Sequence, residues 1–308
     1  MNTSKVCGND IVGIIGCGGI GDLILSQQCG HLISQGYDPK RPLVYFYYPV
    51  RDEVFRVIQY LFPLNSHQIS EEYDRGNNFE KDEKYRDMFK KDHPYLDIVY
   101  WVVPDLLFVN NYAFNYKKYN IDIQTIKSTR VLLNSRYPAQ KIIYCALATS
   151  TPNYHYPYLR QLFIDLAGAL PSHTIYFPNI TKWGGKELSF GDLTNLPSNI
   201  YIHDNPDFIE SLEVLKKSEY CICTCNGTSH ISYHLGIPRL ILDPQFERPA
   251  WVARWKENES ECIDRLIDPG TIARIVKTNI EMPQTSLIDR KYLLYDQDWE
   301  RVLMLKKY

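Results

Sequence analysis

The sequence has no excess of charge of either sign, because 34 lysines and arginines stand against 36 aspartates and glutamates, for a formal net charge of −2. A protein whose main task is to bind nucleic acid usually carries a basic excess, so the composition gives no strong nucleic-acid signal. Long hydrophobic runs are also missing. No stretch approaches the roughly 18 uninterrupted apolar residues of a membrane helix, and the polar start of the chain is unlike a signal peptide. These absences predict a cytoplasmic protein.

Cysteine is present but without the dense pattern of a disulfide framework, which is expected in small secreted proteins and not in a chain of 308 residues. Cys221, Cys223 and Cys225 alternate along one predicted strand and therefore face one side of a sheet. Zinc ligands usually converge from a turn at C-x-x-C spacing. Burial of three small apolar side chains is the better interpretation.

Two other spacings are compatible with metal ligation and are better explained without it. His230 and His234 lie four residues apart, but no acidic residue completes an H-E-x-x-H motif. Asp296 and Asp298 are two apart in a stretch predicted to be helical, where such neighbours do not share a face. We therefore predict no metal site and no bound cofactor.

Strand-like apolar runs alternate with amphipathic helical stretches along both halves of the chain, which indicates βαβ units and parallel sheets. Two domains are predicted, 1–139 and 140–308, joined through a polar, proline-containing stretch at 134–140. Residues 71–93 are strongly charged and are predicted to form an exposed insertion, and the last twenty residues a helix that packs back onto the first domain. We predict strands at 11–15, 43–48, 98–103, 142–147, 174–177, 200–203, 220–224 and 240–242, and helices at 23–34, 53–61, 159–170, 208–217 and 229–235.

The fold class is therefore α/β, with two Rossmann-like parallel-sheet domains that face a central cleft. Ligands of such sheets bind at the carboxyl ends of the strands. The sequence motifs should accordingly lie where strands end and helices begin.

A glycine-rich turn follows the first predicted strand. Gly16, Gly18 and Gly21 fit G-x-G-x-x-G, in which glycines let the backbone approach a phosphate and the next helix offers free N–H donors. An NAD(P)-dependent oxidoreductase would also place an acidic residue at the end of the second strand, to bind a ribose hydroxyl. Here that strand ends in Tyr48 and the nearest acid, Asp52, lies further on, so this alternative rests on the turn alone.

Asp22 follows the last of these glycines directly. An acidic residue at a helix start is stabilised by the helix dipole, so capping is the interpretation that the local pattern favours. The sharper alternative is a general base at the floor of the cleft.

The segment at 226–230 has the composition of an anion site. Gly227 permits a tight turn from strand to helix, and Thr228, Ser229 and the free N–H groups behind Gly227 suit a pyrophosphate. His230, in the first helical turn, could reach the same phosphates or a sugar hydroxyl.

This segment resembles the donor-binding motif of the ADP-heptose:lipopolysaccharide heptosyltransferase family, in which a glycine is followed by two residues, a histidine and a helix ending in Leu-Gly-x-Pro. Residues 19–22, Gly-Ile-Gly-Asp, resemble the family's opening motif, whose aspartate is regarded as the catalytic base. Thr149 and Ser150 with residues 155–157, His-Tyr-Pro, resemble its threonine pair and histidine-tryptophan-proline run. Trp183, Gly184 and Glu187 resemble its tryptophan-glycine-glutamate loop.

The sequence departs from the family pattern at two positions. Cys225 stands where the family has an aspartate, and Tyr154 where it has a lysine. Lys182, Lys186 or Arg239 could supply the positive charge of the missing lysine.

The resemblance implies a two-domain glycosyltransferase of the GT-B type that moves a sugar from a nucleotide-sugar donor to an acceptor hydroxyl. Asp22 would take the hydroxyl's proton, and a single displacement without metal would invert the anomeric carbon. Gly18, Gly19 and Gly21 would line the acceptor side of the cleft. The donor would be bound in the second domain by Thr149, Ser150, Lys182, Glu187, Asn226, Gly227, Thr228, Ser229 and His230.

Two alternatives from other classes stay open, a non-catalytic nucleotide-sugar binder and an NAD(P)-dependent oxidoreductase. The acceptor would be a carbohydrate or glycoconjugate, and lipopolysaccharide, capsule, protein and modified DNA are equally compatible with the sequence. A membrane-associated acceptor would bring the chain into peripheral contact with a membrane, to which residues 71–93 could contribute.

Overall fold

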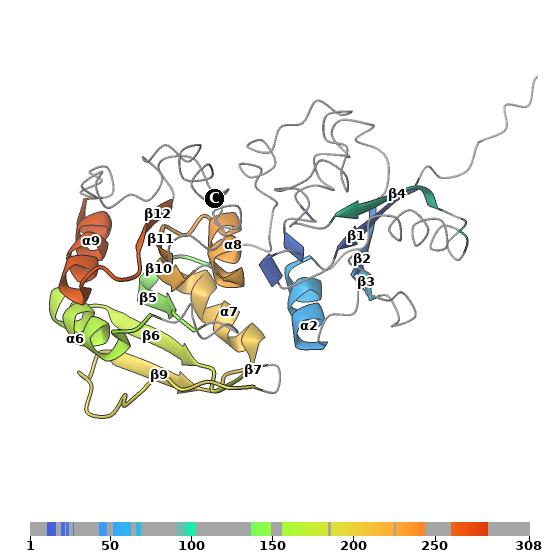
Figure 1. Ribbon diagram of the computed structural model, residues 1–308. Helices are drawn as coiled ribbons and strands as arrows, with labels where there is room; N and C mark the ends of the chain where they lie inside the picture. Colours follow the sequence, from blue (N-terminus) through green and yellow to red (C-terminus); the bar gives the residue numbers. More distant parts are fainter. Residues whose placement is uncertain are drawn as a thin grey trace, which may run out of the picture. The chain divides into compact units, whose positions relative to one another are not determined.

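The computed structural model describes residues 11–16, 43–47, 52–62, 66–68, 96–102, 137–148, 156–183, 186–224, 226–243 and 260–282, together with residues 20, 21, 23, 24, 27, 91 and 94. The chain divides into two compact units, Met1–Asn134 and Ser135–Tyr308. Figure 1 shows a separate sheet in each unit.

The first unit contains a four-stranded parallel sheet. Its strands are β1 (Ile11–Gly16), β2 (Leu43–Tyr47), β3 (Ser66–Gln68) and β4 (Leu96–Val102), in the spatial order β3-β2-β1-β4. Helix α2 (Asp52–Leu61) follows β2 and buries Val54, Val57, Ile58 and Leu61, the i, i+3, i+4, i+7 spacing of an amphipathic helix.

The helix predicted at 23–34 begins earlier than expected. Ile20 and Gly21 are already helical, as are Leu23, Ile24 and Gln27 further along. The apolar members of this group are buried, Leu23 and Ile24 completely. Gly21 therefore lies within a helical turn and not in a loop.

Among its described residues, the second unit contains a six-stranded parallel sheet and four helices. The strands are β5 (Gln140–Ala146), β6 (Thr174–Asn179), β9 (Ile200–Asp204), β10 (Ser218–Thr224), β11 (Arg239–Asp243) and β12 (Ser260–Asp264). Their spatial order is β12-β11-β10-β5-β6-β9. A short antiparallel pair, β7 (Lys182–Trp183) and β8 (Lys186–Glu187), follows β6 in the chain. The helices are α6 (Leu159–Ala169), α7 (Phe208–Lys217), α8 (Gly227–His234) and α9 (Pro269–Glu281).

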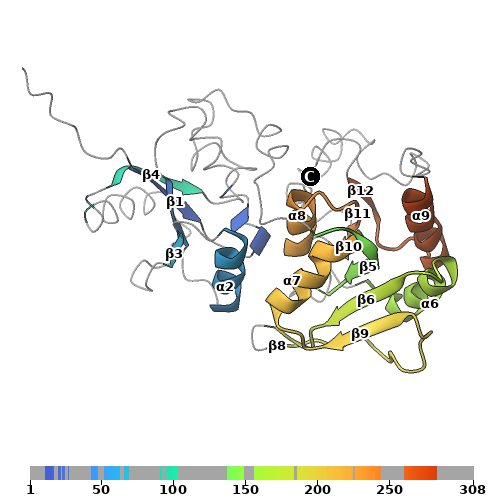
Figure 2. The ribbon, with the colours of Figure 1, turned by 180° about the vertical axis from the view of Figure 1, so that it is seen from behind.

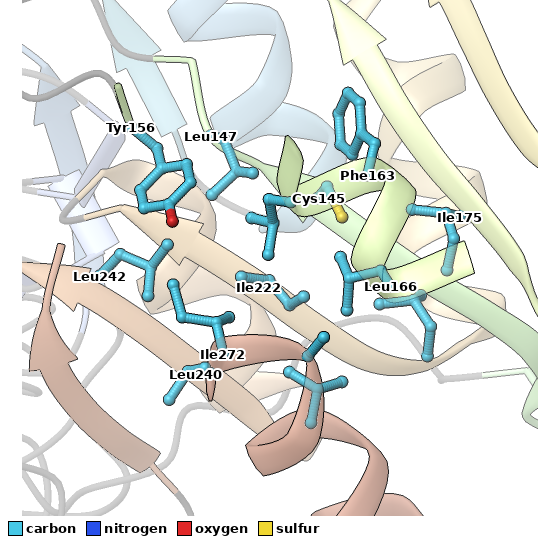
Figure 3. Packing of buried hydrophobic residues seen from close by; sticks show 14 of the residues in the cluster. Cys145, Leu147, Tyr156, Phe163, Leu166, Ile175, Ile222, Leu240, Leu242 and Ile272 are labelled. Carbon is cyan, nitrogen blue, oxygen red and sulfur yellow. The ribbon is translucent and has the colours of Figure 1, made fainter. Parts of the chain in front are cut away.

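The two faces of this sheet are covered by different helix pairs. Helices α6 and α9 lie together on one face, which we call the outer face, and α7 and α8 lie on the other, the inner face (Figures 1 and 2). Because both faces are covered, the central strands β5 and β10 read as near-continuous apolar runs, as expected for a buried parallel sheet. The main core lies under the outer face, where aliphatic and aromatic side chains from the sheet meet α6 and α9 (Figure 3).

The α/β class and the parallel sheets are confirmed, and α7 occupies the predicted residues. Strands β3, β7, β8 and β12 and helix α9 were not predicted. Helix α9 carried a sequence signal, since Asp268 caps it through Thr271 N at 2.8 Å and Pro269 is its first residue.

Several predictions lie outside the described residues. They include the insertion at 71–93, apart from its residue 91, and the C-terminal helix. The acceptor and donor roles of the domains 1–139 and 140–308, and a cleft between them, stay predictions. In the part of the chain that the structure describes, every helix is too short or too polar to span a bilayer.

Candidate functional site

The carboxyl ends of the six parallel strands in the second unit lie at one edge of the sheet. Strands β10, β5, β6 and β9 are consecutive neighbours there, so the segments that follow them are brought together although they are far apart in the sequence. A ligand of a parallel sheet binds at this edge. The segments at 226–230 and 182–187 both begin there, after β10 and β6.

Asn226 caps helix α8 at this edge. Its backbone is extended and its side-chain Oδ1 accepts hydrogen bonds from the N–H groups of Thr228 at 3.0 Å and Ser229 at 3.3 Å. The Ser229 hydroxyl returns a bond of 2.7 Å to the carbonyl of Asn226. The first turn of α8 is therefore tightly constrained by its own capping residue.

This capping changes the expected anion site. The N–H groups of Thr228 and Ser229 were predicted to be free for a pyrophosphate, and that prediction is wrong, because Asn226 engages both. The side chains of Thr228, Ser229 and His230 are themselves buried, with exposed fractions of 7%, 2% and 4%. In this conformation these two N–H groups are not available as direct donors to a ligand.

The side-chain amide of Asn226 also reaches the neighbouring strand. Its Nδ2 donates to the carbonyls of Ala146 at 2.9 Å and Ala148 at 3.2 Å, at the end of β5, and lies 3.3 Å from Thr224 Oγ1. One amide thus connects the ends of β5 and β10 with the start of α8.

Arg239 supports the same helical turn from below. It is the first residue of β11 and is almost completely buried, with 1% exposed. Its Nη1 donates to the carbonyl of Ser229, and its guanidinium lies 5.1 Å from the ring centroid of Tyr233. Arg239 therefore holds α8 in place from the amino end of the strand, and does not lie at the ligand edge as a substitute for a phosphate-binding lysine.

Helix α8 ends as its sequence predicts. Gly236 has a positive φ of 66°, and its N–H bonds to Tyr233 O at 2.9 Å while Ile237 N bonds to Ser232 O at 2.9 Å. This is a Schellman motif, which needs a left-handed residue at Gly236. Both ends of the short helix are thus fixed by side-chain or backbone bonds.

Lys182 and Glu187 are brought opposite one another. They are cross-strand partners in the β7–β8 hairpin, as are Trp183 and Lys186. Gly184 and Gly185, which lie between them in the sequence, are outside the described residues. The described residues of the predicted tryptophan-glycine-glutamate loop therefore form an antiparallel strand pair.

Polar residues that the sequence did not single out fix the base of this hairpin. Asn205 has a positive φ of 47°, and its Oδ1 accepts bonds from the backbone N–H of Thr181 at 2.9 Å and from its hydroxyl at 2.8 Å. Asn179 Nδ2 donates to Asp204 Oδ1 at 2.6 Å. The Asn205-Pro206 pair was the available signal, since asparagine tolerates a left-handed conformation and this dipeptide marks turns.

The inner face of the sheet carries buried tyrosines. The hydroxyl of Tyr144 hydrogen-bonds to Ser211 of α7, and that of Tyr176 lies 2.9 Å from His203 Nδ1. Burial raises the pKa of Tyr144 far above its ordinary value and that of Tyr176 to about 12. Both hydroxyls are therefore neutral and serve as fixed hydrogen-bonding groups.

Cys221 and Cys223 are completely buried, as predicted, and Cys225, the third cysteine of that prediction, lies outside the described residues. Burial raises the pKa of the Cys223 thiol well above its ordinary value, so the protonated, unreactive form is favoured. Cys145, on the opposite face of the sheet, is also buried, and burial raises its pKa in the same way.

Several predicted site residues lie outside the described part of the chain. They are Gly18, Gly19, Asp22, Thr149 and Ser150. Tyr156, the tyrosine of the predicted histidine-tyrosine-proline motif, is buried and donates from its hydroxyl to Ile267 O at 3.2 Å.

No family model and no curated protein matches the sequence. Solved structures do match in fold. A glycosyltransferase of family 9 from Veillonella parvula has a TM-score of 0.55 at 9% identity, over 99% of this chain and 98% of that chain. E. coli ADP-heptose LPS heptosyltransferase II has a TM-score of 0.54 at 12% identity, over 90% of this chain and 100% of its own.

A third match is E. coli heptosyltransferase WaaC with ADP, with a TM-score of 0.54 at 10% identity, over 87% of this chain and 99% of that chain. At identities this low the likeness establishes the fold. The chain has the fold of GT-B glycosyltransferases, as its motifs implied, and within that class it is similar to family 9 and heptosyltransferase structures.

Proposed function

We propose that the chain is a glycosyltransferase that moves a sugar from a nucleotide-sugar donor to an acceptor hydroxyl. The observation that carries the proposal is the match in fold to a family 9 glycosyltransferase over 99% of the chain. The motif order supports it independently, since each family-like segment described in the second unit follows the carboxyl end of a parallel strand, where such sheets bind ligands.

The donor would bind at the edge formed by β5, β6 and β10. The constrained first turn of α8 directs the positive end of the helix dipole toward this edge. This partial charge would stabilise a diphosphate as it leaves the sugar. The WaaC structure with ADP supports a nucleotide as the donor's leaving group by analogy of fold.

Asp22 would act as general base and accept the proton of the acceptor hydroxyl, while that oxygen attacks the anomeric carbon. A single displacement of this kind inverts the configuration and needs no cofactor or metal. The acceptor would be a carbohydrate or glycoconjugate bound by the first domain.

A thermal-shift screen tests donor binding. The chain is heated with ADP-, UDP-, GDP-, CMP- and dTDP-sugars, with NAD and NADP as controls. A ligand at 100 times its dissociation constant adds about 2.7 kcal/mol to the free energy of unfolding, so a binding donor gives a clear shift. A shift with NAD or NADP alone would overturn the proposal in favour of an oxidoreductase.

The Asp22→Asn variant tests the base. Transfer should be abolished while donor affinity stays within a few-fold of wild type, because the amide cannot accept the proton. Loss of donor affinity in this variant would instead make Asp22 a structural residue, in keeping with a helix cap.

A non-catalytic nucleotide-sugar binder is the second candidate, favoured by Cys225 and Tyr154 where the family has an aspartate and a lysine. Such a protein would show the thermal shift but no turnover with any acceptor. Release of nucleoside diphosphate with an acceptor, beyond hydrolysis without one, excludes it.

A further inference from the structure

The side chain of Asn226 joins two segments of the proposed donor site. Its amide nitrogen bonds to Ala146 O and Ala148 O, 80 and 78 residues away in the sequence, while its Oδ1 holds the first turn of α8. The two N–H hydrogens of the amide are thus shared between carbonyls at the end of β5, and its oxygen is used entirely for the helix.

Capping alone does not require an amide at this position. Helix α7 is capped by Asp207 and helix α9 by Asp268, and both carboxylates accept backbone N–H bonds as Asn226 does. Asparagine, aspartate and serine are about equally good capping residues. An ionised carboxylate can accept from the helix but has no hydrogen to donate to a neighbouring strand, whereas the amide of Asn226 does both at the same time. The second function is what distinguishes Asn226 from the other two caps.

The two joined segments carry the residues that the sequence assigns to the donor. Ala148 is followed directly by Thr149 and Ser150, and Asn226 by 227–230. The bond between Ala148 and Asn226 therefore holds the residue that precedes Thr149 and Ser150 in the sequence next to the residue that precedes 227–230.

We infer that Asn226 is a positioning residue of the donor site, which holds the end of β5 against the first turn of α8 so that both bind one nucleotide-sugar. This replaces the direct donor contact that the sequence pattern assigned to it. The inference rests on the proposed function, and it makes a structural claim that is testable without any ligand.

Two variants remove the bonds to β5 and keep the helix cap. Asn226→Ser retains a neutral capping oxygen but is too short to reach Ala146, and Asn226→Asp retains the shape and capping oxygen but cannot donate when ionised. The control is Asp268→Ala, which removes a cap from α9 on the opposite face of the sheet. Amide hydrogen exchange is measured for all three in the full chain, followed by calorimetric titration with ADP, UDP, GDP, CDP and dTDP.

Both Asn226 variants should exchange at least tenfold faster than wild type in 143–148 and in 227–231, and should bind the preferred diphosphate at least tenfold more weakly. Asp268→Ala should change neither segment and bind normally. Binding by Asn226→Asp is compared with Asn226→Ser, because only the former adds a negative charge near the diphosphate. A loss confined to Asn226→Asp would be repulsion and would overturn the inference.

The exchange and binding results separate the possible failures. Unchanged exchange at 143–148 in both Asn226 variants would overturn the connection itself. Faster exchange with unchanged affinity would overturn its role in donor binding. If no diphosphate binds the wild-type chain, the proposed function fails, while the exchange data still decide whether Asn226 joins the two segments.

Discussion

The two faces of the six-stranded sheet are built from different chemistry. On the outer face, β5, β10 and β11 present Cys145, Ile222 and Leu240, which lie in one register and pack under α6 and α9 (Figure 3). One residue earlier the same strands present Tyr144, Cys221 and Arg239 to the inner face, and the row continues into Tyr176 and Tyr201 on β6 and β9. The period of two along each strand creates this difference.

The two faces therefore contribute to the structure in different ways. Aliphatic packing on the outer face is non-directional and supplies stability. Hydrogen bonds on the inner face are directional, and they fix α7 through Tyr144 and Ser211 and α8 through Arg239 and Ser229. The helix that begins at the proposed donor site thus makes directional polar contacts with the sheet, whereas α9 packs on it mainly through apolar side chains.

The largest effect on stability is expected on the outer face. Phe163 of α6 is completely buried, with its ring centroid 5.2 Å from that of Phe177. Phe163→Ala should lower the free energy of unfolding by about 3–5 kcal/mol, because the cavity cannot close in a packed core. Urea unfolding measures the loss. Nucleotide affinity of the folded variant should stay at the wild-type value, and a weakened affinity would show that the faces are not separable.

Arg239→Met should give a smaller loss of stability and a larger loss of function. The charged hydrogen bond to Ser229 O and the contact with Tyr233 disappear, at a cost of about 2 kcal/mol. Arg239→Lys should recover little, because a lysine cannot both stack on the ring and present a planar fork. If the Arg239→Met variant binds nucleoside diphosphate with the same affinity as the Phe163→Ala variant, the position of α8 does not depend on the contact between Arg239 and Ser229.

The inner tyrosines should make the protein sensitive to alkali. The pKa of Tyr176 in the folded chain is raised from 10.0 to about 12, so its contribution to stability is complete below pH 10 and is lost as the pH rises through 12. Tyr176→Phe should cost about 1 kcal/mol at pH 7 and flatten the alkaline limb of a stability–pH profile. A profile unchanged by the substitution would contradict the burial of this hydroxyl.

The smallest effect is expected at the cap of α9. Asp268→Ala should cost about 1 kcal/mol at neutral pH. Hydrogen bonds from Thr271 lower the pKa of Asp268, so its contribution is present above the ordinary carboxyl pKa and is lost as the pH falls through the lowered value. The variant should therefore lose less stability on acidification than wild type, as thermal unfolding at pH 7 and pH 3 would measure.

Much of the second unit could be predicted from the sequence. The apolar runs of β5 and β10 and the amphipathic pattern of α7 are local signals, and the turn at 226–230 and the glycine after α8 follow from backbone preferences. Strand β12 was missed because it is a short edge strand with the mixed sequence SECID. The hairpin β7–β8 was missed because two-residue strands have no period.

The sequence by itself determined the α/β alternation, the fold resemblance and the residues that follow each strand, because these depend on local pattern and motif order. Only the tertiary structure decided what those residues do to each other. The strand order places Ala146 beside Asn226. The asparagine that the sequence pattern assigned to nucleotide-sugar binding is therefore hydrogen-bonded to a strand 80 residues away in the sequence. The strand order also buries Arg239 under α8. Such contacts depend on which strands become neighbours, and that is settled by the packing of the whole sheet and not by any single segment.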